Sequence, residues 1–140
     1  MTKMIKCVSP IDGSVYAERP TLSLEQAQAA VARAKAAQLG WAARPLTERI
    51  ALVSAGVERV GAMNDIIVEE LAWQMGRPVR YGGEFGGFSE RANYMADIAE
   101  DALAPIEISD DGNFKRYIKR IPHGAVFVVA PWNYPYMTAI

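Results

Sequence analysis

A wholly apolar run that is rich in valine extends from Ala125 to Ala130, close to the end of this chain. A short run of this kind, placed between Gly124 and Pro131, is typical of a β-strand that is covered on both faces. Strands of this type occur in parallel sheets that carry helices on both sides. The run therefore predicts an α/β fold, and it constrains the architecture more than any other feature of the sequence.

The beginning of the chain has the pattern of a β-hairpin. Lys3–Ser9 and Ser14–Glu18 are short extended candidates on either side of a turn that contains Asp12 and Gly13. An Asp-Gly pair favours the positive φ angles that tight hairpin turns require. We predict two antiparallel strands there.

Two helices with apolar residues at spacings of three and four are predicted after the hairpin. Ser23 and Gln26 form a capping-box pattern at the start of the first helix, which continues to Gly40. The second helix follows Pro45, and its apolar positions repeat up to Val60.

A third and a fourth helix follow. Asn64 is expected to cap the third, and Gly76 is expected to end it. The fourth is predicted from about Glu84 to Leu103, with a weak start because residues 82–87 are rich in glycine. These glycines do not match a dinucleotide-binding fingerprint and indicate a loop or close helix packing.

The last third of the chain returns to extended structure. Ile106–Gly112 is predicted as a loop, and Phe114–Ile121, which carries many charges, as an exposed or edge strand. Only the run at 125–130 is typical of the centre of a sheet, although a parallel sheet needs several such strands. Because Tyr136–Ile140 is apolar and has no helix-ending signal, we expect these 140 residues to be part of a longer α/β protein.

Composition excludes several classes of function. The chain has 15 basic and 16 acidic residues and a formal net charge of −1, so no nucleic-acid partner is expected. No apolar run reaches the roughly 20 residues of a membrane helix, and Met1–Pro10 lacks a signal-peptide core, so no membrane partner is expected and a cytoplasmic location is the default. With Cys7 as the single cysteine, no disulfide or cysteine-based metal cluster is expected.

The residues after the apolar run carry the most specific chemistry. Pro131 and Pro135 restrict the turn between them, which lies where α/β proteins build ligand sites, at the carboxyl end of a strand. The side-chain amide of Asn133 is neutral and donates two hydrogen bonds, so it suits an oxyanion site. Equally, asparagine commonly caps a helix, and from the residues alone both interpretations stay open.

Val128–Pro135 resembles the strand-to-helix segment of the aldehyde dehydrogenase superfamily, in which Pro-Trp-Asn is followed by an aromatic residue and proline. Each further match is weak alone, but their order and spacing are specific. Ser9–Gly13 matches the family's Asn-Pro-x-x-Gly turn, with serine in place of asparagine, and Ala27–Trp41 matches its first helix. Glu48–Arg49 matches the start of its second helix. Glu70–Pro78 matches its Glu-x-Gly-Lys-Pro turn, here with methionine and arginine.

The resemblance implies the N-terminal part of a Rossmann-like cofactor domain with a small oligomerisation segment. It divides the chain into a hairpin with helices (1–113), an oligomerisation strand (114–122), and a central strand with the start of the active-site helix (123–140). It also implies NAD or NADP as cofactor, a small aldehyde as substrate, and assembly into a homodimer or homotetramer.

Individual roles follow from the same resemblance. Asn133 would hold the substrate oxygen during attack by a cysteine thiolate. The cofactor would be lined by Val129, Ala130, Pro131 and Trp132, and the aldehyde by Tyr134 and Met137. No metal ligand is implied.

The family's catalytic cysteine and glutamate match no residue up to Ile140, and Cys7 has no neighbouring base in sequence to activate it. These 140 residues alone are therefore expected to be inactive. Two alternatives remain open: a relative that reduces an acyl-phosphate or acyl-CoA, and a catalytically silent interaction module.

Overall fold

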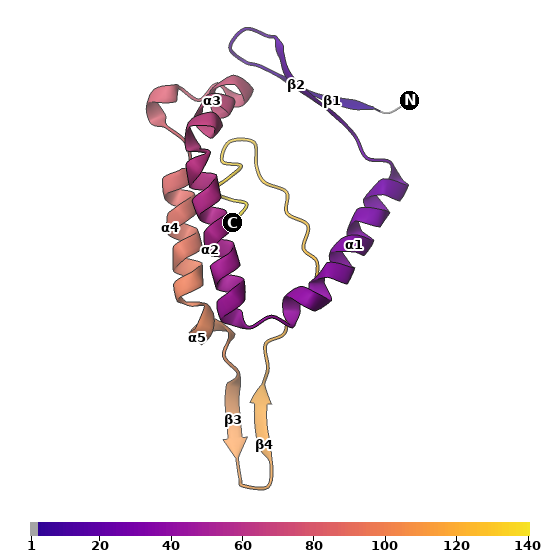
Figure 1. The fold of residues 1–140 in the computed structure, drawn as a ribbon, viewed down its shortest axis with the longest axis vertical. Coiled ribbons are helices and arrows are strands. Elements are labelled where there is room, and N and C mark those ends of the chain that lie inside the picture. The colour runs from indigo at the N-terminus through magenta and orange to yellow at the C-terminus, as the bar shows by residue number, and fades with distance from the viewer. Residues whose placement is uncertain (1–2) are drawn as a thin grey trace.

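The computed structural model describes residues 3–140 and contains helices and two separate β-hairpins (Figure 1). In chain order the elements are β1 (Met4–Val8), β2 (Val15–Pro20), α1 (Leu24–Ala42), α2 (Leu46–Ala62), α3 (Asn64–Met75), the 3-10 helix η1 (Val79–Tyr81), α4 (Phe85–Asp97), α5 (Ala99–Leu103), β3 (Ile106–Asp110) and β4 (Lys115–Ile118).

The predicted N-terminal hairpin is confirmed. β1 and β2 pair in antiparallel fashion, and the register shifts next to Val8. The turn is held by Ser9, whose amide donates to the Ser14 carbonyl at 2.8 Å and whose carbonyl accepts from the Gly13 amide at 3.0 Å. Gly13 has φ +76°, the conformation that an Asp-Gly turn supplies. Stacked rings of Tyr16 and Trp73 connect this hairpin to α3.

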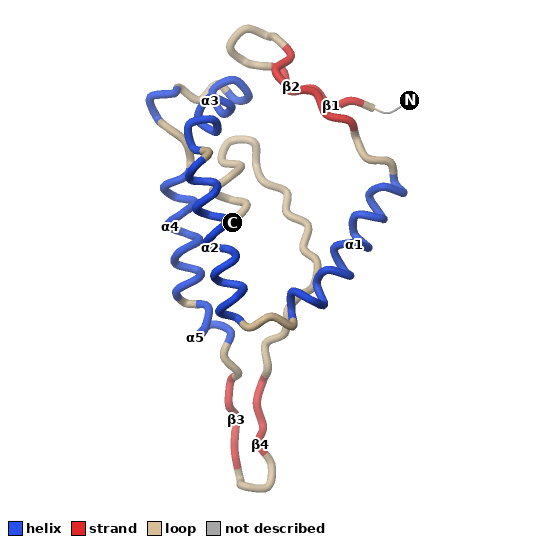
Figure 2. The backbone as a smooth tube through the Cα atoms, in the orientation of Figure 1, coloured by secondary structure: helices blue, strands red, loops and turns tan. Residues whose placement is uncertain are grey.

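The capping box predicted for α1 is present. The Gln26 amide donates to Ser23 Oγ at 3.1 Å, and the Ser23 amide donates to Gln26 Oε1 at 2.8 Å. The helix itself stands apart from α2–α4 (Figure 2) and contributes no buried residue. Its apolar positions, such as Leu24 and Leu39, therefore face outward.

At α3 the structure confirms one predicted end and corrects the other. Gly76 ends the helix in the left-handed conformation, and its amide donates to the Ala72 carbonyl. Asn64, however, is the first helical residue and not the cap. Met63 occupies the cap position, with no side-chain hydrogen bond, because α3 follows α2 almost directly.

The core lies where α2 and α4 pack side by side (Figure 1). It contains Val57 of α2 with Phe88 and Ala92 of α4, and Tyr136 packs against this cluster from near the end of the chain. Gly61 permits the close approach of the two helices, since a Cβ atom there would lie 2.5 Å from the Phe85 ring. Within residues 3–140, no helix has the length and apolar character needed to cross a membrane.

The predicted fourth helix is divided in two. α4 ends at Asp97, and Ile98 adopts ψ −5° before the short helix α5 begins. The predicted loop at 106–112 is wrong over most of its length, since Ile106–Asp110 is β3 and pairs with β4. β4 confirms the exposed strand predicted at 114–121, in a shorter form. Pairs of side chains on neighbouring strands stabilise a sheet, and such pairs cannot be recognised in β3 alone. The sequence therefore predicts a loop where β3 lies.

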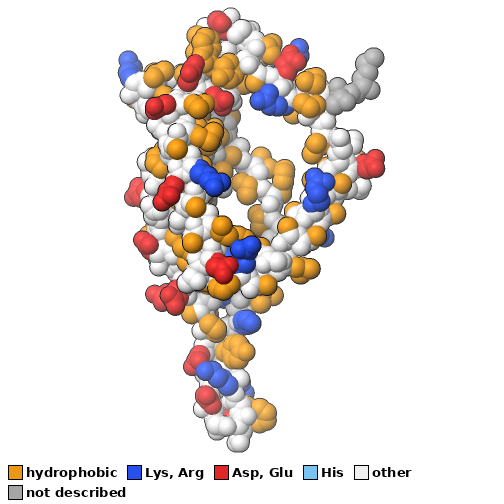
Figure 3. Space-filling view, viewed as in Figure 1, with side chains coloured by type: hydrophobic (Ala, Val, Ile, Leu, Met, Phe, Trp, Pro, Cys, Tyr) orange, Lys and Arg blue, Asp and Glu red, His pale blue; other side chains and the backbone are white. Residues whose placement is uncertain are grey.

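The apolar run at 125–130 differs most from the prediction. It is extended but belongs to no sheet, and in Figure 1 it passes between α1 and α2 as an unpaired segment. Instead of being covered, it exposes most of its side chains, and Phe127 is 91% exposed. Orange hydrophobic side chains are correspondingly frequent on the face shown in Figure 3. Residues 135–139 form consecutive turns, where the start of a helix is predicted.

Candidate active site

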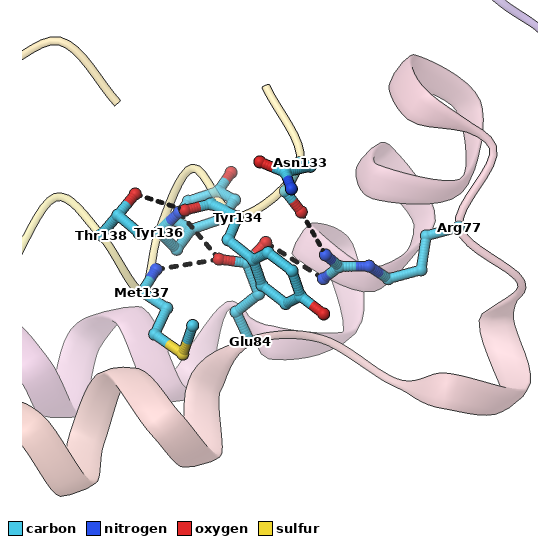
Figure 4. Close-up of polar contacts among 7 residues, drawn as sticks. All are labelled: Arg77, Glu84, Asn133, Tyr134, Tyr136, Met137 and Thr138. Carbon is cyan, nitrogen blue, oxygen red and sulfur yellow. Dashed lines mark hydrogen bonds and ion pairs between the residues drawn. The ribbon is translucent and has the colours of Figure 1, made fainter. Parts of the chain in front are cut away.

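Asn133 lies on a turn that packs over the N-terminal end of α4 (Figure 4). We call residues 132–139 the Asn133 turn. Its apolar anchor is Tyr136, which packs against the core cluster of α2 and α4. Burial raises the pKa of Tyr136 above the ordinary value of 10.0, and the charges of Glu70 and Glu84 raise it further. The phenol is therefore neutral at physiological pH and adds no second negative charge beside Glu84.

Glu84, the residue before α4, binds the backbone of the Asn133 turn. Its Oε2 atom accepts hydrogen bonds from the amides of Tyr136 at 3.0 Å and Met137 at 2.8 Å. The side chain is only 2% exposed, so its charge requires compensation inside the protein. Arg77 supplies it, with Nη1 at 3.0 Å from Glu84 Oε1.

Arg77 also contacts the turn directly. Its second terminal nitrogen, Nη2, donates to the backbone carbonyl of Asn133 at 2.6 Å. The guanidinium lies over the Tyr134 ring, 4.9 Å from the ring centre, in cation–π geometry. One arginine thus bridges Glu84, the Asn133 carbonyl and the Tyr134 ring, as Figure 4 shows.

Met137 is held from α4. Its carbonyl accepts a hydrogen bond from Arg91 at 3.0 Å, and its sulfur lies against Gly87, where a Cβ atom would approach to 2.8 Å. At Gly87 the glycine-rich start of α4 is thus a place of close packing, one of the two interpretations that the sequence left open. Met137 lines an open pocket of about 420 Å³ with Glu90, Tyr94 and other residues of α4.

The side chain of Asn133 is free, in contrast to its backbone. In the part of the chain that the structure describes, no hydrogen bond involves its amide, and no helix follows it. The helix-cap interpretation is therefore not realised here. The amides of Tyr136 and Met137 are bound by Glu84, a residue outside the turn. An exposed, uncommitted amide can donate two hydrogen bonds to a ligand.

The four residues predicted to line the cofactor directly precede Asn133: Val129, Ala130 and Pro131 lie outside any helix or strand, and Trp132 is the first residue of the Asn133 turn. Val129 is 76% exposed and Trp132 is 77% exposed, whereas Ala130 is half-buried. Residues 125–132 contain no charged side chain, so they can offer apolar contacts to a ring but no ion pair to a phosphate.

The other candidates have structural contacts. Cys7 Sγ is 3.8 Å from the carbonyl of Gln74, at the junction between β1 and α3, and within residues 3–140 no hydrogen bond joins it to an imidazole or an amine. Among residues 3–140, no group of three or more histidine, cysteine or acidic side chains is placed to hold a metal ion.

Sequence reasoning did not identify Arg77, Glu84 or Arg91 as parts of this site. In the sequence, Arg77 belongs to the turn that ends the third helix and resembles the family's Gly-Lys-Pro, and Glu84 marks the predicted start of the fourth helix. Glu84 and Met137 are 53 residues apart in the sequence, so no local sequence pattern predicts their contact. A charged residue inside an otherwise glycine-rich helix start was the available signal.

Comparison with known proteins matches all of residues 1–140 to the model of the aldehyde dehydrogenase family. A putative succinate-semialdehyde dehydrogenase [NADP(+)] of Mycolicibacterium smegmatis is 32% identical over 124 residues, covering 86% of this chain and 24% of that protein. A vanillin dehydrogenase of Corynebacterium glutamicum is 31% identical over 139 residues, covering 91% of this chain and 27% of that protein.

Solved structures agree with the sequence comparisons. PnpE in complex with nicotinamide adenine dinucleotide superposes with a TM-score of 0.85 at 28% identity, over 96% of this chain and 28% of that one. The predicted fold class, the N-terminal part of an α/β aldehyde dehydrogenase fold, is confirmed. The chain spans about a quarter of the length of the relatives that it matches.

Proposed function

This chain belongs to the aldehyde dehydrogenase family, and from that premise we propose that it is the amino-terminal part of an NAD(P)-dependent enzyme that oxidises an aldehyde to a carboxylic acid. In this proposal Asn133 is the oxyanion donor. The observation that carries the proposal concerns the two parts of Asn133. Its backbone carbonyl is bound by Arg77, while its side-chain amide makes no hydrogen bond within residues 3–140 and can bind a ligand.

The chemistry explains why such an amide is useful. When a cysteine thiolate attacks an aldehyde, a carbon–sulfur bond forms and the carbonyl oxygen takes the negative charge. A neutral donor in a fixed position stabilises that charge without taking part in proton transfer. The family resemblance assigns the thiolate, and the glutamate that activates water to hydrolyse the thioester, to positions beyond Ile140.

Val129, Ala130, Pro131 and Trp132 are proposed to hold the nicotinamide end of NAD or NADP. Their apolar and accessible arrangement fits the face of a planar ring. Such a cofactor supplies the acceptor for the aldehyde hydride. The relatives' names include NADP(+) and nicotinamide adenine dinucleotide, so either cofactor is compatible with the proposal.

The substrate is proposed to be a small aldehyde that reaches Asn133 beside Tyr134 and Met137. Met137 supports this placement because it lines the open pocket beside α4. The relatives' names refer to both a semialdehyde and vanillin, and so do not narrow the aldehyde further.

We also propose self-association, as a homodimer or homotetramer, through the β3–β4 hairpin. Both of its strands are exposed throughout, including the apolar side chains of Ile108, Tyr117 and Ile118. An uncovered strand edge of this kind readily pairs with another chain. The oligomerisation segment would then begin at Ile106 and include more than the predicted strand at 114–122.

The test uses the full-length enzyme, an aldehyde panel and either cofactor, with reduced cofactor followed by its absorbance. Asn133→Ala should lower kcat by about 10²- to 10³-fold, the usual loss when one oxyanion donor is removed. Asn93→Ala is a matched control, since Asn93 is an exposed asparagine of α4 whose side chain donates to Ser89 of the same helix.

Two results would overturn the proposal. Full activity of Asn133→Ala would remove the oxyanion role. A wild-type protein that reduces acyl-CoA or acyl-phosphate without releasing acid, or that turns over no aldehyde at all, would favour the alternative reductase or the silent module.

A further inference from the structure

The side chain of the proposed donor Asn133 makes no hydrogen bond within residues 3–140, so the direction in which it points depends on the backbone of the turn. That backbone is held at two places. Arg77 binds the Asn133 carbonyl, and Glu84 binds the amides of Tyr136 and Met137. The holding points lie on both sides of Pro135, which itself has no amide hydrogen to contribute.

The two holding groups also bind each other. Arg77 Nη1 is 3.0 Å from Glu84 Oε1, and both side chains are largely withdrawn from solvent, at 13% and 2% exposure. Each charge therefore depends on the other for compensation, and neither can change rotamer alone without leaving a buried charge unpaired. The arrangement is more rigid than two separate hydrogen bonds would be.

We infer that Arg77 and Glu84 are positioning residues for Asn133, fixing the turn so that its free amide points at the developing oxyanion. This inference rests on the proposed function. Neither residue touches the substrate in this arrangement, and both act through the backbone. Errors of about 1 Å in such a site can cost roughly 10²-fold in rate.

The arginine is important for its shape as well as its charge. Nη1 and Nη2 bind Glu84 and the Asn133 carbonyl at the same time. A lysine would keep the charge but has a single nitrogen, which cannot bind Glu84 and the Asn133 carbonyl in the same planar fork. Arg77→Lys therefore separates positioning from charge compensation.

A double-mutant cycle in the full-length enzyme provides the first test. Arg77→Lys should lower kcat about tenfold, with KM for the aldehyde nearly unchanged, because an interaction made in the transition state is weakened. In the Asn133→Ala background the same substitution should have no further effect on kcat. An equal loss in both backgrounds would show that Arg77 does not act through Asn133 and would overturn the inference.

A second test does not depend on activity. Amide hydrogen exchange at Tyr136 and Met137 should become faster in Glu84→Gln, which leaves Arg77 facing an amide in place of a carboxylate. Glu48→Gln is the control, because the ion pair of Glu48 with Arg44 is exposed to solvent. If Glu84→Gln does not fold, Arg77→Lys carries the same measurement at Asn133 to Met137.

The outcomes separate the two proposals. Unchanged exchange at Tyr136 and Met137 would overturn the positioning role whether or not the enzyme is active. A wild-type protein that shows the expected exchange but oxidises no aldehyde would overturn the proposed function, and with it the catalytic purpose of the positioning.

Discussion

Glu84 Oε2 lies 2.8 Å from the backbone nitrogen of Met137, a residue 53 positions further along the chain. This bond joins the start of α4 to the turn that presents Asn133. The same carboxylate oxygen accepts a hydrogen bond from the amide of Tyr136 at 3.0 Å, so a side chain outside the turn binds both amides. The site is thus built on the α3–α4 connection as much as on the motif that contains Asn133.

Loss of the Glu84 carboxylate should be costly for stability. In Glu84→Ala, Arg77 and two turn amides lose their partner inside the protein, a change that typically costs about 3–5 kcal/mol. Glu48→Ala removes an exposed pair at i and i+4, worth about 0.3–0.5 kcal/mol. The midpoints of thermal unfolding of the two variants measure the difference. Equal midpoints would mean that the buried Glu84–Arg77 pair stabilises the protein no more than the exposed Glu48–Arg44 pair.

Two glycines of α2 should respond in opposite ways to alanine. A Cβ atom at Gly61 would lie 2.5 Å from the Phe85 ring, so Gly61→Ala should destabilise the protein by about 1–3 kcal/mol through overpacking. Gly56 has nothing within 4 Å of the same atom, and Gly56→Ala should stabilise the helix by roughly 0.5–1 kcal/mol. Denaturant unfolding distinguishes them, and a stabilised Gly61→Ala would show that α2 and α4 do not pack this closely.

Features that depend on neighbouring residues were predictable from the sequence. The Ser23–Gln26 capping box and the left-handed Gly76 need only a few consecutive residues to form, and both are present. The hairpin around Gly13 belongs to the same class. The motif at Asn133 was also recognisable, because its prolines and aromatic residues are consecutive.

Features that depend on distant partners were not predictable. The residues of β3 predict a loop when they are considered alone, and β3 is a strand because it pairs with β4. The run at 125–130 has the composition of a buried strand, yet no strand among residues 3–140 lies beside it. Glu84 shows the same limit at the site, since its role arises from two amides more than 50 residues away.

The turn of the β3–β4 hairpin should weaken in acid. Asp111 accepts hydrogen bonds from the amides of Asn113 and Phe114 and binds Arg116. Arg116 first, and then these amides, hold the pKa of Asp111 below its ordinary 3.8. Because the folded pKa is the lower one, the contribution to stability is complete above pH 3.8 and is lost as the pH falls through the folded pKa.

A carboxyl titration followed by NMR checks this effect. The Asp111 resonance should titrate below 3.8 in the wild-type protein, and Arg116→Met should move the midpoint upward, towards that value. Lys115→Met is the matched control, since Lys115 pairs with Glu107 on the neighbouring strand. A midpoint that does not move in Arg116→Met would contradict the assigned cause.

Gly76 and Gly13 allow the conformational cost of a left-handed residue to be separated from the cost of packing. Both have φ +76°, so alanine at either position should cost about 1–2 kcal/mol through backbone strain. At Gly13 a Cβ atom meets nothing within 4 Å, whereas at Gly76 it would lie 3.1 Å from Pro10 Cγ. Gly76→Ala should therefore lower the unfolding midpoint further than Gly13→Ala.

Since Arg77 directly follows Gly76 in the chain, Gly76→Ala should also reduce kcat, whereas Gly13→Ala should leave kcat unchanged. Equal effects of the two variants on both measurements would show that the contact between the hairpin and the end of α3 is not important for holding Arg77 in place.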